Sequence, residues 1–180
     1  MNSNDLYDYL YRCLNGMNVE FNVLPADYLK REIFSSLKNK YFVVNNQNSN
    51  HPGEHWLAVC VIDDNYEFFD SYALGYEFYG NEFLNVFKQM KTVVQSNKVL
   101  QNEYSDVCGQ YCLFYIAKKV LGCSLAHIYK YFSANTICND EIVRKFVCKQ
   151  NNHLFHKTCR LKTEILLQGC VYKNKIVKNC

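Results

Sequence analysis

The chain has 180 residues, 49% of them hydrophobic, and a formal net charge of +3. This length and composition predict one folded domain with a proper core and argue against a disordered chain. The small positive charge does not by itself identify a nucleic-acid partner. No apolar stretch approaches the roughly 20 residues of a membrane span. The first ten residues lack the basic and apolar regions of a secretory signal, so we expect an intracellular protein.

The hydrophobic periodicity predicts alternating helices and strands, without repeats or an obvious linker. In chain order, the predicted elements are a helix at 5–14, a helix at 26–38, strands at 41–45, 55–62 and 66–70, a helix at 76–90, strands at 91–95 and 98–101, and helices at 109–121, 125–132 and 140–150. The turn residues between 62 and 66 predict that the second and third strands form a hairpin. The tail at 151–180 is basic and less regular.

The ten cysteines contain no C-x-x-C pair, so the usual zinc or redox spacing is absent and no metal site is predicted. Without export, most of these thiols should stay reduced. Many of them are expected to be small buried hydrophobic residues.

Cys108 differs from the other cysteines in its position. A polar turn at 102–107 precedes it and a long apolar helix follows, so it lies at or just before a helix N-terminus. Unpaired N–H groups and the positive end of the helix dipole stabilise a thiolate there. The alternative is a buried structural cysteine, and Cys112, one turn further on, is more typical of the core.

His55 and Asp70 lie at the open end of the predicted hairpin. A tight turn would pair Asp70 with Leu57, which puts Asp70 diagonal to His55, about 7–8 Å away between backbones. The carboxylate could then accept a hydrogen bond from the imidazole and stabilise its charged form. His51, in the preceding loop, is the rival base, whereas the two turn aspartates are expected to be solvated.

Three further residues are candidates for the site. Gln101 lies seven positions before Cys108, and its amide could join the Cys108 N–H as a donor to an oxyanion. Trp56 alternates to the strand face opposite His55, where a core position is expected first and a wall of a substrate cleft second. Gly109 would let the backbone approach closely beside the thiol.

The combined pattern resembles the adenovirus-type cysteine proteases (adenain) and the wider clan that includes the SUMO proteases. The residues that carry it are His55-Trp56, Phe69-Asp70 and Gln101, followed after six residues by Cys108-Gly109. The order His, acidic residue, Cys is the clan's order, and the six-residue gap fits adenain better than the SUMO proteases. The resemblance is best over 41–121 and holds only in outline elsewhere.

The resemblance implies an α+β fold: one compact domain over 1–180, with a mixed β-sheet packed by helices and the nucleophile at the start of a buried helix. His55 would be the general base and acid, Asp70 its orienting partner, Cys108 the nucleophile and Gln101 part of the oxyanion hole. Trp56 and Gly109 would border the substrate. The chain would be an endopeptidase that cleaves viral or virus-like-element capsid or polyprotein precursors near glycine.

The resemblance also implies a location and a form of regulation. The protein would act in the host nucleus or cytoplasm, or packaged in virions, and its chemistry would require no cofactor. Adenain is stimulated by a peptide and by DNA. The peptide forms a disulfide with a cysteine between the acidic residue and the nucleophile, and here no cysteine lies between Cys60 and Cys108. DNA could bind the tail at 151–180 through phosphate contacts, although a solvated run of charges is at least as good an interpretation. Asp70 replaces the glutamate of the best-known adenains.

Two other functions use the same residues differently. The first is removal of ubiquitin-like proteins, which needs a wide surface for a folded partner; the short chain favours precursor cleavage instead. The second is an inactive binding module, for example on DNA, which the complete set of catalytic residue types argues against.

Overall fold

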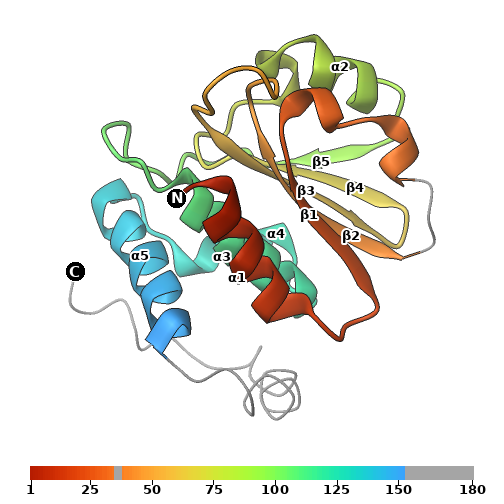
Figure 1. Ribbon diagram of the computed structural model, residues 1–180. Helices are drawn as coiled ribbons and strands as arrows, with labels where there is room; N and C mark the ends of the chain where they lie inside the picture. The colour runs from red at the N-terminus through yellow and green to blue at the C-terminus, as the bar shows by residue number, and fades with distance from the viewer. Residues whose placement is uncertain (35–37, 153–180) are drawn as a thin grey trace.

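A five-stranded mixed sheet runs through the centre of the protein, with helices on both of its faces (Figure 1). The computed structural model describes residues 1–34 and 38–152. The strands are ordered β1-β2-β3-β4-β5 across the sheet and comprise Val19–Leu24, Asn39–Asn45, Trp56–Ile62, Asn65–Phe69 and Val93–Gln95. The β2–β3 and β3–β4 pairs are antiparallel, and the two outer pairs are parallel. The predicted α+β class, a mixed sheet packed by helices, is confirmed.

Short 3-10 turns and longer α-helices cover the two faces. The α-helices are α1 (Ser3–Leu14), α2 (Asn81–Phe87), α3 (Cys108–Val120), α4 (Leu125–Ile128) and α5 (Thr136–Asn152). The 3-10 turns are η1 (Ala26–Tyr28), η2 (Arg31–Phe34), η3 (Tyr76–Tyr79) and η4 (Tyr129–Tyr131). Within the described residues, none of these helices combines the length and the apolar character needed to cross a membrane.

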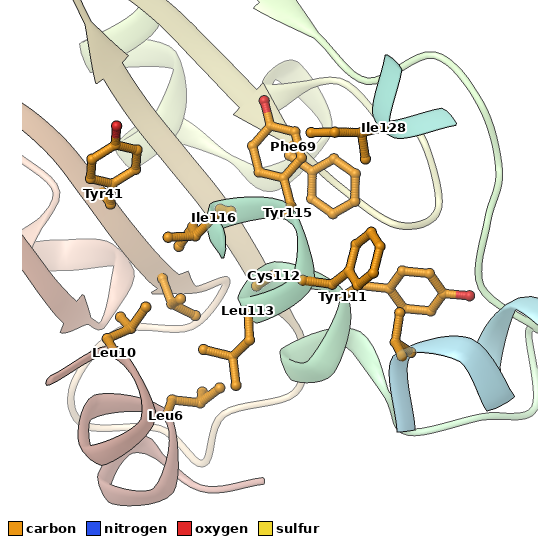
Figure 2. Packing of buried hydrophobic residues seen from close by; sticks show 14 of the residues in the cluster. Leu6, Leu10, Tyr41, Phe69, Tyr111, Cys112, Leu113, Tyr115, Ile116 and Ile128 are labelled. Carbon is orange, nitrogen blue, oxygen red and sulfur yellow. The ribbon is translucent and has the colours of Figure 1, made fainter. Parts of the chain in front are cut away.

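Helix α3 is the centre of the larger core cluster. It is buried on nearly all sides over its first half, which explains why its sequence is apolar all round and not amphipathic. Figure 2 shows Leu6 and Leu10 of α1 approaching Leu113 of α3. On the sheet side, the Tyr115 ring stacks on Phe69 of β4 with centroids 4.2 Å apart. This packing fixes where α3 begins, and its first residue is Cys108, one residue before the start of the helix predicted at 109–121.

The opposite face of the sheet carries a second core cluster. Phe68 of β4 packs there edge-on against Phe83 and Phe87 of α2, with centroids 6.0 and 5.6 Å away. Neighbouring residues on each central strand therefore point into different cores, as strand geometry requires. Both faces being covered explains the continuous apolar runs of β2 and β3.

The predicted hairpin is confirmed, and its turn sets the register of β3 and β4. Asp63 and Asp64 both have left-handed φ angles, 49° and 60°, which is the pattern of a two-residue type I′ turn. Ile62 then pairs with Asn65, and Ala58 with Phe69 at the other end. The same register continued by one residue places Asp70 across from Leu57.

Some predicted elements are wrong. The helix predicted at 26–38 is instead the two 3-10 turns η1 and η2, because Leu29 between them is extended and buries its side chain under the sheet; residues 35–37 lie outside the description. The helix predicted at 76–90 is interrupted at Gly80, whose φ is 91°. The strand at 98–101 is absent because the Leu100 and Gln101 N–H groups both donate to the Ser71 carbonyl and not to a strand.

Strand β1 was not predicted. It is an edge strand of mostly half-buried residues, paired in parallel with β2, so its pattern lacks the strong alternation or continuous apolar run of a more deeply packed strand. Helix α5 begins at Thr136, four residues before the predicted start. Residues 153–180 of the predicted basic tail lie outside the described residues.

Leu113→Ala should lower the free energy of unfolding by about 2–5 kcal/mol, because it leaves a cavity where α1, α3 and the sheet meet. Denaturant unfolding of the full chain measures the change. Tyr104→Ala is the control, since Tyr104 is 90% exposed and its loss should change the free energy by less than about 0.5 kcal/mol. Equal effects of the two substitutions would contradict the central position of α3.

Candidate active site

Three elements bring the predicted residues together. His55 immediately precedes β3, Asp70 immediately follows β4, and Cys108 is the first residue of α3. Because β3 and β4 are antiparallel, the start of one and the end of the other lie at the same edge of the sheet. Helix α3 packs across the sheet with its N-terminus at this edge, so its thiol reaches the imidazole.

His55 and Asp70 form the best-defined pair of the site. The imidazole Nε2 lies 2.8 Å from Asp70 Oδ1. The carboxylate is fully buried and also accepts hydrogen bonds from the Tyr72 and Leu74 N–H groups, at 3.0 and 2.8 Å, and from the Tyr79 hydroxyl, at 2.8 Å. Burial by itself would raise the pKa of Asp70, but these hydrogen bonds and the His55 charge hold it below its ordinary value.

The imidazole of His55 lies between two tyrosine rings. Its centroid is 5.1 Å from that of Tyr72, and the Tyr79 ring stacks on it at 6.0 Å with an interplanar angle of 16°. Burial favours the neutral ring, but the hydrogen bonds and charges of Asp70 and Cys108 outweigh it and raise the pKa of His55 to about 9. The aromatic faces also favour a cationic ring between them. His55 is therefore held as an imidazolium at neutral pH.

The pKa of the Cys108 thiol is shifted in the opposite direction from that of His55. The residue is 7% exposed, and burial by itself would raise the pKa of its thiol. The hydrogen bond and charge of His55, together with the backbone N–H groups of Trp56 and Gly109, reverse that effect and lower the pKa below its ordinary value. Since Asp70 engages Nε2, the ring nitrogen left for the sulfur is Nδ1.

Two other buried thiols near the site have raised pKa values, unlike Cys108. Burial raises the pKa of Cys112, one turn along α3, and of Cys60 on β3 well above the ordinary value. Neither has the opposing hydrogen bond that His55 provides to Cys108. A thiolate nucleophile is therefore favoured at Cys108 and disfavoured at the two other positions.

Gln101 has a buried amide whose orientation is fixed at both ends. Its Oε1 accepts from the Ser71 hydroxyl at 2.7 Å, and its Nε2 donates to the Ser105 carbonyl at 2.8 Å. The same amide hydrogen-bonds to the Tyr72 phenol, whose ring lies over His55. Both N–H groups of the amide thus have acceptors within the protein, and the predicted role of Gln101 in an oxyanion hole stays a prediction.

Trp56 and Gly109 lie beside the thiol. Trp56 is half-buried and packs against the core cluster on the α3 side of the sheet. A Cβ on Gly109 would lie 3.2 Å from Leu6 Cδ2 and 3.4 Å from Trp56 Cδ1, so glycine allows α3 to approach both side chains. Their contact with substrate stays a prediction.

The rival residues lie elsewhere. His51 is exposed in the loop before His55, and the aspartates of the hairpin turn are exposed at the opposite end of β3. Within residues 1–34 and 38–152, no three histidine, cysteine, aspartate or glutamate side chains converge in a way that could hold a metal ion.

Sequence reasoning missed several side chains that support the acid–base pair. Ser96 accepts the Asp70 N–H at 2.8 Å and donates to the Asp70 carbonyl at 2.9 Å, and Tyr79 donates to the carboxylate as described above. Tyr72, two residues after Asp70, could have been proposed from proximity alone. Tyr79 and Ser96 could not, because a turn and the β4–β5 pairing bring them back to Asp70.

Comparisons with known proteins give limited similarity. No protein-family model matches the chain, and no curated protein matches it. Among solved structures, it is similar to the ASFV pS273R protease, at 24% identity and a TM-score of 0.41 over 61% of this chain and 42% of that one. It is also similar to AvrA delL154 with IP6 and CoA, at 15% identity and a TM-score of 0.45 over 78% of this chain and 68% of that one. The match thus spans less than half the length of the ASFV protease.

The opposite pKa shifts predict a pH window for the thiolate–imidazolium pair. Alkylation of Cys108 by iodoacetamide should rise through a midpoint below the ordinary thiol pKa, because the thiolate forms there. Any activity that uses His55 as an acid should fall as the pH passes about 9, where the imidazolium loses its proton. Mass spectrometry of the alkylated cysteines at a series of pH values measures the midpoint for Cys108.

His55→Ala is the matched variant for this measurement. It removes both the hydrogen bond and the charge, so the Cys108 midpoint should move to higher pH. Labelling of the exposed Cys148 serves as the internal reference in both proteins. A wild-type midpoint at or above the ordinary thiol pKa would contradict the ion pair.

Proposed function

We propose that this chain is a cysteine endopeptidase whose catalytic residues are Cys108, His55 and Asp70. The observation that carries the proposal is the continuous hydrogen-bonded line from the buried Asp70 carboxylate, through the imidazole at 2.8 Å, to the thiol at the start of α3. A structural cysteine has no need of an imidazolium partner or of two N–H groups directed at its sulfur. Nucleophile, base and orienting acid in this order are the parts of a thiol hydrolase.

In the proposed acylation step, the Cys108 thiolate attacks the carbonyl carbon of a peptide bond. The carbonyl oxygen becomes an oxyanion that the Cys108 N–H and the Gln101 amide stabilise. The His55 Nδ1–H then protonates the departing amine as the C–N bond breaks, which leaves a thioester on Cys108 and a neutral imidazole.

In the proposed deacylation step, neutral His55 removes a proton from water, and the resulting hydroxide attacks the thioester carbonyl. The C–S bond breaks, the product leaves as a carboxylic acid that then loses its proton to solvent, and the thiolate–imidazolium pair is restored. Asp70 stays ionised throughout and stabilises His55 whenever it is charged. No step needs a metal ion or a redox partner.

For the substrate, we propose capsid or polyprotein precursors cleaved near glycine. The support is the resemblance of the His55-Trp56 and Gln101–Cys108 spacings to adenain. An activating peptide or DNA, and a site of action in an infected cell or virion, belong to the same proposal. The tail that would contact DNA lies outside the described residues.

Cys108→Ala should abolish peptide hydrolysis while leaving the fold intact, because it removes only the nucleophilic sulfur. Cys112→Ala is the matched control, since it removes a thiol one turn away and should keep most of the activity. The measurement is turnover together with mass-spectrometric mapping of the cysteine labelled by peptide vinyl sulfones ending in Gly-Gly or Gly-X-Gly. Equal loss of turnover in both variants, or labelling spread over several cysteines, would contradict the assignment.

Gln101→Ala should reduce turnover roughly 10²–10³-fold, by analogy with the loss of other oxyanion donors. Labelling of Cys108 by iodoacetamide should persist, because the alkylation forms no oxyanion. Gln89→Ala, in the exposed turn just after α2, removes the same kind of amide away from the site and should leave turnover unchanged. A reduction of less than about threefold for Gln101→Ala would remove Gln101 from the proposed oxyanion hole.

A further inference from the structure

The side-chain amide of Gln101 has no donor to spare. Its nitrogen Nε2 carries two hydrogens, of which one goes to the Ser105 carbonyl at 2.8 Å and the other to the Tyr72 phenol. The other end of the amide is held as well, because Oε1 accepts from the Ser71 hydroxyl at 2.7 Å. The residue is only 2% exposed. An oxyanion can therefore gain a hydrogen bond from this amide only by replacing one of its two acceptors.

The Ser105 carbonyl is the acceptor that is fixed in place. The N–H and the hydroxyl of Ser105 both donate to the Asn102 carbonyl, at 3.1 and 3.0 Å, which closes the turn on itself. Asn102 in turn contacts α5, where its N–H lies 3.4 Å from Asp140 Oδ1 and its side chain donates to the Thr136 hydroxyl at 3.3 Å. The backbone of this turn thus cannot move away from Gln101 without breaking several hydrogen bonds.

The Tyr72 phenol is the acceptor that is held weakly. Its ring is half-buried, with its centroid 5.1 Å from that of the His55 imidazole. Its hydroxyl lies 3.4 and 3.5 Å from the Ser105 and Asn102 carbonyl oxygens, which is longer than an ordinary O–H···O hydrogen bond. Phenol and amide therefore lie against the same Ser105 carbonyl, the amide at full bonding distance and the phenol at its margin. A small shift of the phenol releases the second N–H of Gln101 and leaves the turn intact.

The phenol is also a weaker acceptor than an oxyanion. Burial and the charges of Cys108, Asp140 and Asp70 raise the pKa of Tyr72, so the phenol is neutral wherever the thiolate–imidazolium pair exists. A hydrogen bond to an ionised oxygen is roughly twice as strong as one to a neutral oxygen. The oxyanion of a tetrahedral intermediate can therefore displace the phenol, whereas a neutral substrate carbonyl lacks this advantage of charge.

We propose that Tyr72 is a positioning residue that keeps the second N–H of Gln101 occupied until an oxyanion takes the place of the phenol. The inference rests on the proposed protease function and adds a control on its oxyanion hole. Tyr72 acts through Gln101 and is not a catalytic residue. The exchange offsets part of the stabilisation that the amide gives to the oxyanion, and it confines that stabilisation to the charged intermediate.

Tyr72→Phe is the direct test, because it removes the phenol oxygen and keeps the ring beside His55. On fluorogenic peptides with glycine at the cleavage site, kcat/KM should rise roughly 2–10-fold, which corresponds to the loss of one competing neutral hydrogen bond. A purely structural role of Tyr72 predicts a loss of activity and not a gain. Iodoacetamide should alkylate Cys108 at the wild-type rate and with the wild-type pH midpoint, because alkylation forms no oxyanion.

Two further comparisons test whether the gain passes through Gln101. In a Gln101→Ala background, Tyr72→Phe should change kcat/KM by less than about twofold, because the donor that the phenol occupied is gone. Tyr28→Phe removes the same hydroxyl from an exposed side chain of η1 and should leave kcat/KM unchanged. Thermal unfolding shows whether each variant keeps the native fold.

The outcomes separate this inference from the proposed function. If the wild-type enzyme cleaves peptides and a folded Tyr72→Phe variant cleaves them no faster, the role of Tyr72 is wrong and the protease function stands. Equal gains with and without Gln101 have the same meaning, since Tyr72 would then act by another route. If the wild-type enzyme cleaves no peptide and Cys108 reacts no faster with iodoacetamide than the exposed Cys148, the protease proposal fails and this inference fails with it.

Discussion

The rest of the site depends on a charged carboxylate that has no contact with water. Asp70 can stay ionised while fully buried only because one imidazole, one phenol and two backbone N–H groups surround its two oxygens. Those donors come from the start of β3, from the turn after β4 and from η3. The hairpin register and the turn geometry are therefore constrained by the same charge that orients His55. The site and the fold at this edge of the sheet cannot vary independently.

Helix α3 links the core to the chemistry. Its middle turns pack against the sheet and α1, and that packing presents its unpaired N-terminal N–H groups, with Cys108, to the end of the hairpin. The Tyr111 hydroxyl on the same helix lies within hydrogen-bond distance of the Leu100 carbonyl oxygen, at 2.9 Å, and of Asp140 of α5, at 3.0 Å. These contacts hold the segment that contains Gln101 against the helix that carries the thiol. The two proposed oxyanion donors, Gln101 and the Cys108 N–H, therefore keep fixed positions relative to each other.

Local patterns predicted the parts of this arrangement that depend on neighbours in the chain. Asp63 and Asp64, both with left-handed φ angles, form the two-residue turn of the hairpin. This turn sets the β3–β4 register, which brings Asp70 within reach of His55. Patterns failed where packing overrode periodicity. The helical spacing at 26–38 became two 3-10 turns, because Leu29 and Phe34 must each reach the sheet. Gly80 divided the helix predicted at 76–90, and the edge strand β1 gave too weak a pattern to recognise.

The sequence by itself determined the hairpin and the start of the buried helix at or next to Cys108, because these follow from hydrophobic spacing and turn residues over short distances. The α+β class was predicted from the resemblance of its motifs to a known family. Only the tertiary structure decided the protonation of the site and its surroundings. The burial of Asp70 and the tyrosine rings around His55 come from elements far apart in the chain. Desolvation and hydrogen bonding depend on the position of every neighbour in space, and a linear pattern contains no record of those positions.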